Sequence, residues 1–384
     1  MKKVIYLDNA ATTRVRPEVV EAMLPYFTEH YGNPSSVYDF STPCKKAMAH
    51  TREVIAGSLG ASENEIYFTN GGTEADNWAL KAAAEAYASK GKHIITTQIE
   101  HHAVLHTGQY LEKLGYEVTY LPVDENGVVS VDALKKAVRP DTILISVMFA
   151  NNEIGTIEPI REIGEVAKEH GILFHTDAVQ AYCHEPINVD ELHIDMLSAS
   201  AHKFNGPKGV GFLYIDEKAK VRPILFGGGQ QKGMRSGTEN VPGCAGLGAA
   251  VREVYRDHEA KIEKLYQIRE WLIAGLKELP GVTINGHEGR ENAPQIVSAS
   301  FEGVRSEVLL HALEDRGVYV SSGSACSVNH PGVSGTLKGI GVKKELLDST
   351  IRFSFGLFNE PEEADYCLEV LRELLPVLRR YRAK

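Results

Sequence analysis

The sequence predicts an α/β fold with a seven-stranded, mainly parallel sheet domain and a smaller α+β domain. The chain has 384 residues, which is long for one hydrophobic core and favours two. Between residues 65 and 215, short apolar runs alternate with amphipathic helical stretches. After Gly248 the alternation stops, and long helical stretches enclose a few isolated strands.

The apolar runs of the first region are typical of buried strands, because most are rich in β-branched or aromatic residues and are bounded by Gly, Asn or Pro. The predicted strands cover residues 65–69, 93–97, 117–121, 142–149, 173–177, 196–199 and 211–215. Helical patterns lie between several of them, at residues 74–90, 102–114 and 160–169. Such alternation predicts parallel neighbours joined by right-handed crossovers. No helix separates the last two strands, so one strand is expected to be antiparallel.

The second region predicts the α+β part. One long helix is expected from about Gly248 to Leu279, with a group of charges near its middle. Strands are expected at residues 282–284, 296–301, 318–321 and 351–354, and further helices at 305–316 and 361–381. No internal repeat or low-complexity tract interrupts the pattern.

Charge and composition narrow the range of partners. The formal net charge of −10 argues against DNA, other nucleic acids or an anionic membrane as the main partner. The basic tail at residues 379–384 is expected to be a solvated helix end, with docking of a partner protein as the alternative. No apolar run has the length of a membrane span, and Asp8 interrupts any secretory segment, so a cytoplasmic protein is expected.

The five cysteines are odd in number and scattered. Without a CxxC pair they predict neither a disulfide framework nor a zinc site, and no metal is expected. Four of them, Cys44, Cys183, Cys244 and Cys367, are expected to be packing residues.

Polar side chains follow the predicted strands at the point where each strand ends. They occur at residues 69–74, 100–102, 151–153, 177–180 and 198–203. In an open α/β sheet, ligands bind beyond the carboxyl ends of the strands, so these groups predict one site at one rim.

Two of these groups suggest a phosphorylated cofactor. Gly71, Gly72 and Thr73 join a strand to a helix, where free N–H groups bind an anion; a simple glycine turn with a threonine cap is the equal alternative. Lys203 follows another strand, and a partly desolvated lysine can form a Schiff base, whereas a surface lysine would have no such role. Asp177, one strand earlier, suits the pyridinium nitrogen of pyridoxal 5'-phosphate and favours the cofactor interpretation.

With these motifs the chain resembles the NifS-like cysteine desulfurases, a group of class-V aminotransferases within the fold-type-I pyridoxal-phosphate enzymes. The resemblance spans nearly the whole chain and rests on the motifs YLDNAATT (6–13), GNPSS (32–36), NNEIG (151–155), HTDAVQ (175–180), RSGT (235–238) and IRFS (351–354). It implies a large cofactor-binding domain at residues 15–250. The small domain would comprise residues 1–14 and 251–384 and carry a mobile cysteine loop at about 322–336.

The resemblance also implies a role for each matching residue. Lys203 would form the Schiff base and move protons, with His101 stacked on the ring as a further acid or base. The ring would be held by Asp177 and Gln180, and the phosphate by Gly72, Thr73, Ser200, His202 and, from a neighbouring subunit of a homodimer, Thr238. Asn152, beside the cofactor, and Arg352 would bind the carboxylate of L-cysteine.

The segment SSGSACS at residues 321–327 resembles the loop that carries the nucleophile in one group of these enzymes. Cys326 would take sulfur as a persulfide and pass it to an acceptor protein, such as an iron–sulfur scaffold, while L-alanine is released. The attacking species is the thiolate, a minor form of an ordinary cysteine at neutral pH, so a base such as His101 would assist. The alternative is an incidental loop thiol.

Other functions stay open at this point. A selenocysteine lyase or a class-V aminotransferase would use the same cofactor, and a cofactor-free interaction module would keep only the fold. Two residues depart from the family pattern: Tyr38 stands where many members have His, and Leu357 replaces a common Arg.

Overall fold

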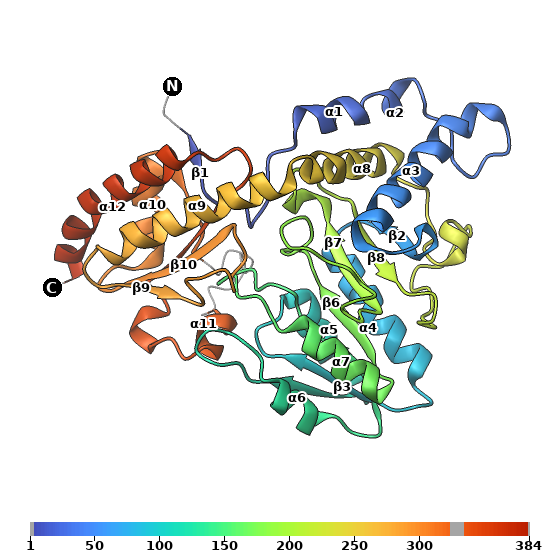
Figure 1. Cartoon of the computed structure of the whole chain (residues 1–384), viewed down its shortest axis with the longest axis horizontal. Coiled ribbons are helices and arrows are strands. Elements are labelled where there is room, and N and C mark those ends of the chain that lie inside the picture. Colours follow the sequence, from blue (N-terminus) through green and yellow to red (C-terminus); the bar gives the residue numbers. More distant parts are fainter. Residues whose placement is uncertain (1–3, 323–333, 383–384) are drawn as a thin grey trace.

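The computed structural model describes residues 4–322 and 334–382 (Figure 1). Its central feature is a seven-stranded sheet with the order β2-β8-β7-β6-β5-β3-β4. The strands are β2 (Ile66–Thr69), β3 (His93–Thr97), β4 (Glu117–Leu121), β5 (Thr142–Ser146), β6 (Leu173–Asp177), β7 (Met196–Ser200) and β8 (Gly211–Ile215). Only β8 runs antiparallel to its neighbours, β7 and β2. The predicted sheet, including its single antiparallel strand, is confirmed.

Helices cover both faces of this sheet because successive residues of its strands point to opposite sides. On β5, Leu144 packs into the core under α4 (Gly72–Tyr87) and α5 (His102–Lys113). Its neighbour Ile145 packs into the core under α3 (Thr42–Leu59), α7 (Ile160–His170) and α8 (Val241–Tyr255). The short helices α1 (Pro17–Met23), α2 (Pro25–Thr28) and α6 (Val131–Ala137) complete this part.

A second core lies to one side of the sheet. Its antiparallel strands have the order β12-β10-β9 and cover Thr350–Ser354, Ile296–Phe301 and Val282–Asn285. They pack with α9 (His258–Lys277), α10 (Ser306–Asp315) and α12 (Pro361–Arg382), and α11 (Gly335–Gly339) lies nearer the large sheet. The start of the chain belongs to this core: β1 (Ile5–Tyr6) pairs with β11 (Val318–Tyr319), and Ile5 and Leu7 are fully buried there.

The long helix expected from Gly248 to Leu279 is wrong, because two helices, α8 and α9, occupy this stretch. Arg256 is extended, and Asp257 takes a left-handed conformation with φ of 55°. The break lies where the chain passes from the first core to the second (Figure 1). Neither Gly nor Pro marks it, which is why the sequence pattern did not show it.

None of the described helices is both long enough and apolar enough to cross a membrane.

A buried carboxyl group makes the stability of this fold depend on pH. Glu158, between β5 and α7, is 2% exposed, and its Oε2 accepts one hydrogen bond from the Val129 N–H at 2.9 Å. Its Oε1 has no partner among the described residues, and burial raises the pKa of Glu158 to about 8 from an ordinary 4.5. Between these two values the unfolded chain releases the proton and the folded chain keeps it, so stability falls as the pH rises.

We therefore expect Glu158→Gln to weaken this pH dependence. Between pH 6 and pH 8 the free energy of unfolding of the variant should fall by about 2 kcal/mol less than that of the wild type. Urea denaturation at both pH values measures the difference, with the exposed Glu165→Gln as the matched control. Equal pH slopes for Glu158→Gln and the wild type would contradict this expectation.

Candidate active site

A cavity of about 300 Å³ lies at the carboxyl edge of the large sheet. Residues from four places meet in it: the ends of β5, β6 and β7, the first turns of α4 and α5, strand β12 of the second core, and the N-terminal segment. All the expected site residues that the structure describes line this cavity, apart from Thr238. These are Gly72, Thr73, His101, Asn152, Asp177, Gln180, Ser200, His202, Lys203 and Arg352.

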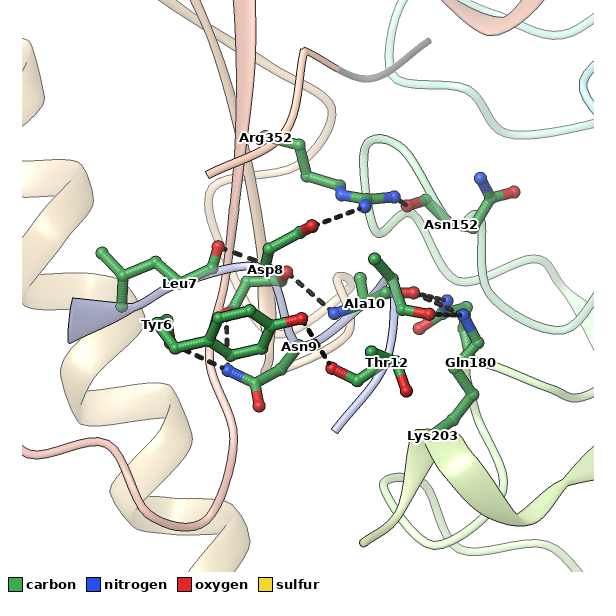
Figure 2. Close-up of polar contacts among 12 residues, drawn as sticks. Tyr6, Leu7, Asp8, Asn9, Ala10, Thr12, Asn152, Gln180, Lys203 and Arg352 are labelled. Atoms are coloured by element: carbon green, nitrogen blue, oxygen red, sulfur yellow. Dashed lines mark hydrogen bonds and ion pairs between the residues drawn. The ribbon is translucent and has the colours of Figure 1, made fainter. Parts of the chain in front are cut away.

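Lys203 reaches the cavity from a single turn that follows β7 directly. Its Nζ donates hydrogen bonds to the carbonyl oxygens of Ala10 at 2.5 Å and Ala11 at 3.0 Å (Figure 2). Gln180 Nε2 donates to the same Ala10 oxygen at 3.0 Å. The N-terminal segment therefore sets the position of both side chains, and it brings the lysine amine to the wall of the cavity.

Asp177 is the last residue of β6 and only 5% exposed. The backbone N–H of Val179 donates to its Oδ1 at 2.9 Å. Burial raises the pKa of Asp177, and the nearby His101 and Lys203 act against this rise. A buried carboxylate of this kind is stabilised by a cation held against it, such as a protonated ring nitrogen.

Asp76 is a cavity residue that the sequence analysis missed. It lies one helical turn after Thr73 on α4, a spacing that places both on the same face and could have drawn attention to it. Its ligand atoms, with those of His101 and Asp177, lie within 4.8 Å of one another, a spacing that would also suit a metal ion. Burial, and next the charge of Asp177, raise the pKa of Asp76, so this pair favours having one neutral member.

His101 is held in place by its role at the start of α5. Its Nδ1 accepts a hydrogen bond from the Ala103 N–H at 3.1 Å, so in the neutral ring the proton is on Nε2. Burial lowers the pKa of His101, which favours this neutral form. A neutral imidazole beside the cavity can accept or donate a proton.

One end of the site is built to hold an anion. Gly71, Gly72, Thr73, Ser200 and His202 also line an adjoining cavity of about 570 Å³. Gly71 has φ of 133°, and a Cβ on Gly72 would lie 2.6 Å from the Val179 Cγ2, so glycines are required for the helix start to approach so closely. Burial lowers the pKa of His202 to about 4, and the neutral ring can still donate one hydrogen bond. Hydroxyls and the N-terminus of α4 supply further donors.

The opposite end carries a buried cation. Arg352, on β12, is 5% exposed, and its Nη1 donates to the Asn152 carbonyl at 2.7 Å. Its Nη2 donates to Asp8 Oδ1 at 3.0 Å, and its Nε has no partner among the described residues (Figure 2). A guanidinium with free N–H capacity at a cavity can bind a carboxylate. The Asn152 side chain also lines this end.

One expected residue is described but lies apart from this arrangement, and another is not described. Thr238 is exposed and does not line the cavity. It follows Arg235, whose guanidinium makes two hydrogen bonds to Glu74 at 2.8 and 3.0 Å and so ties this loop to the first turn of α4. Cys326 lies outside the described residues.

These residues fit pyridoxal 5'-phosphate. The cavity offers an amine, a buried carboxylate one strand away, a neutral imidazole and a cradle of anion donors around two glycines that a Cβ would fill. Asp177 suits the ring nitrogen, Gln180 the ring oxygen, and Thr73, Ser200 and His202 the phosphate. The donor set therefore matches each polar group of the cofactor.

Comparison with known proteins agrees with this geometry. The family model described as aminotransferase class-V matches residues 5–367. The chain is 53% identical over 377 residues to the cysteine desulfurase IscS of Methanosarcina thermophila, covering 98% of this chain and 93% of that protein. A solved NifS-like protein superposes with a TM-score of 0.92 at 39% identity, covering 98% of this chain and all of the other. The structure of SspA in complex with cysteine superposes with a TM-score of 0.83 at 35% identity, covering 93% of this chain and all of the other.

Proposed function

Because the chain belongs to the aminotransferase class-V family and is, within it, a cysteine desulfurase that depends on pyridoxal 5'-phosphate, we propose that it converts L-cysteine to L-alanine and carries the sulfur as a persulfide on Cys326. The observation that carries the proposal is the meeting of Lys203, Asp177 and Arg352 in one cavity. Together they offer an amine and a buried carboxylate for the cofactor and a buried guanidinium for the substrate.

Lys203, Asp177 and His101 would each have a separate role in the reaction. Lys203 would hold the cofactor covalently, and Asp177 would keep a positive charge on its ring nitrogen. When bound, the cofactor supplies an electron-withdrawing ring that stabilises negative charge at the α-carbon of the substrate. The Lys203 amine, once free, takes the proton from that carbon, and the neutral His101 imidazole assists proton transfer in the same cavity.

Substrate binding uses the end of the cavity that faces the second core. Arg352 and Asn152 would hold the α-carboxylate, so that the thiol of the substrate points away from them. One structural relative, SspA, is known in complex with cysteine, which supports cysteine as the ligand of such a site.

Sulfur transfer requires a thiol that can reach the substrate. The four described cysteines, Cys44, Cys183, Cys244 and Cys367, are at most 2% exposed, and burial raises the pKa of each thiol. A buried thiol that resists ionisation is a poor nucleophile. Among the cysteines of this chain, Cys326 is the one left to serve.

The residues that flank this segment support that assignment. Ser321 exchanges two backbone hydrogen bonds with Arg352, at 2.7 and 3.1 Å. On the other side, the Ser334 hydroxyl donates to Glu153, the neighbour of Asn152, at 2.5 Å. Cys326 is five residues from Ser321, and an extended chain of five residues spans roughly 17 Å. A chain of this length, attached beside Arg352 and Asn152, would allow Cys326 to reach the cavity.

Sulfur transfer forms one bond to the sulfur of the substrate and breaks another. The Cys326 thiolate forms a bond to the sulfur of the substrate, and the bond between that sulfur and the β-carbon breaks. The electron pair stays with carbon, which takes up a proton as L-alanine forms. We propose that the persulfide then passes to an acceptor protein such as an iron–sulfur scaffold, in the cytoplasm, where thiols stay reduced.

We propose that the protein acts as a homodimer, in which Thr238 reaches the phosphate site of the neighbouring subunit. Large apolar side chains support an interface, since Val37 is 98% and Phe226 82% exposed, with Tyr31, Tyr38 and Phe27 also open. Exposed apolar side chains mark a contact surface where they gather in one patch.

Light scattering at micromolar concentration should give twice the mass of the chain, and a monomeric mass would contradict the proposal.

Cys326→Ser should abolish persulfide formation and lower the release of alanine from L-cysteine at least about a hundredfold, because the hydroxyl cannot accept sulfur. Alanine assay and mass mapping of the persulfide after incubation with L-cysteine measure both effects. The matched control is Cys44→Ser: Cys44 Sγ donates to the His30 carbonyl at 2.9 Å, a bond that a hydroxyl can keep. Undiminished alanine release by Cys326→Ser would show that the nucleophile is wrongly assigned.

A further inference from the structure

The guanidinium of Arg352 is fixed by two acceptors that approach it from different parts of the chain. Nη1 donates to the Asn152 carbonyl, in the loop after β5, at 2.7 Å. Nη2 donates to the carboxylate of Asp8, in the N-terminal segment, at 3.0 Å. Figure 2 shows Arg352 between these two partners. Two anchored nitrogens define the plane of the group, because guanidinium is rigid and planar.

Asp8 is itself firmly placed. The backbone on either side of it is bonded to Ser354 of β12: the Ser354 N–H donates to the Leu7 carbonyl at 2.7 Å, and the Asn9 N–H donates to the Ser354 carbonyl at 3.1 Å. Ser354 is two residues from Arg352 on the same strand. The distance between the carboxylate and the guanidinium is therefore set by backbone pairing, and only short side chains remain free to adjust it.

Arg352 and Asp8 also carry opposite charges. The side chains of Arg352 and Asp8 are 6% and 20% exposed, so the pair is largely shielded from water. A buried guanidinium without a counter-ion is costly, and Asp8 is the carboxylate in contact with it. Nη1 and Nη2 each donate one hydrogen bond. The buried Nε has no partner among the described residues, and Arg352 lines the cavity.

We propose that Asp8 is a positioning residue that holds Arg352 in the orientation in which its free N–H groups meet the α-carboxylate of the substrate. Asp8 acts through Arg352 and does not touch the substrate. The inference rests on the proposed function, since it takes Arg352 as the carboxylate-binding residue. It makes the N-terminal segment a determinant of substrate affinity, in addition to its bonds to Lys203.

The test compares two ligands of the complete cofactor-bound enzyme. L-cysteine carries the α-carboxylate, and cysteamine is the same molecule without it. Asp8→Ala should raise the KM for L-cysteine about tenfold and leave kcat within about twofold, because loosening a charged hydrogen bond mainly misplaces the carboxylate. Its affinity for cysteamine, followed by the absorbance change of the cofactor, should stay that of the wild type.

A second variant separates orientation from charge. Asp8→Asn keeps an acceptor oxygen for Nη2, so its KM for L-cysteine should stay within about threefold of the wild-type value. In an Arg352→Ala background, Asp8→Ala should add less than about twofold, because a residue that acts only through Arg352 has no further effect once Arg352 is removed. Asp348→Ala is the matched control: it breaks an exposed Asp–Arg pair of 2.9 Å elsewhere.

Three results for Asp8→Ala would overturn the inference. Equal losses for L-cysteine and cysteamine in Asp8→Ala would overturn the inference, and so would an unchanged KM. Tighter binding of L-cysteine by Asp8→Ala would also overturn it, since Asp8 would then compete with the substrate for Arg352. A wild-type enzyme that releases no alanine from L-cysteine would instead contradict the proposed function.

Discussion

The proposed chemistry depends on a carboxylate buried at the end of β6. Asp177 is 5% exposed, and Asp76 lies in the same cavity with 1% of its surface exposed. Two carboxyl groups this close and this dry cannot both be charged at little cost, so the pair favours a cationic partner for one of them. A pyridinium nitrogen would meet that need, and in the proposed function the electron demand of the ring at the substrate follows from the same charge.

The second constraint is that the cavity is shared between two cores. The large sheet supplies Asp177 and Lys203, whereas the second core supplies Arg352. The N-terminal segment joins them, because Leu7 and Asn9 are bonded to β12 while the carbonyls of Ala10 and Ala11 accept from Lys203. A short stretch of backbone therefore connects the Lys203 end of the site with the Arg352 end. Asp8 is part of this stretch.

Much of this was accessible from sequence. Strand boundaries at residues 93–97, 117–121, 173–177 and 211–215 coincide with the predicted ones, because short runs with β-branched or aromatic residues and clear turns at their ends are typical of strands. The clustering of polar residues at one rim also follows from topology alone. The break at Asp257 was not accessible, since its left-handed conformation is adopted by a residue other than Gly and no Pro lies nearby. Asp8 and Asp76 were missed because their roles come from contacts across 344 residues or from burial in a helix that looks ordinary in sequence. The expected domain limits and the role of Cys326 stay predictions.

The central claim is that Lys203 carries the cofactor. The most direct measurement is treatment of the purified protein with borohydride, followed by proteolysis and mass mapping. The added mass of the reduced cofactor is predicted on the peptide that contains Lys203, and it should be lost in Lys203→Ala. Modification at another lysine, such as the nearby Lys208, or no modification at all, would contradict the account.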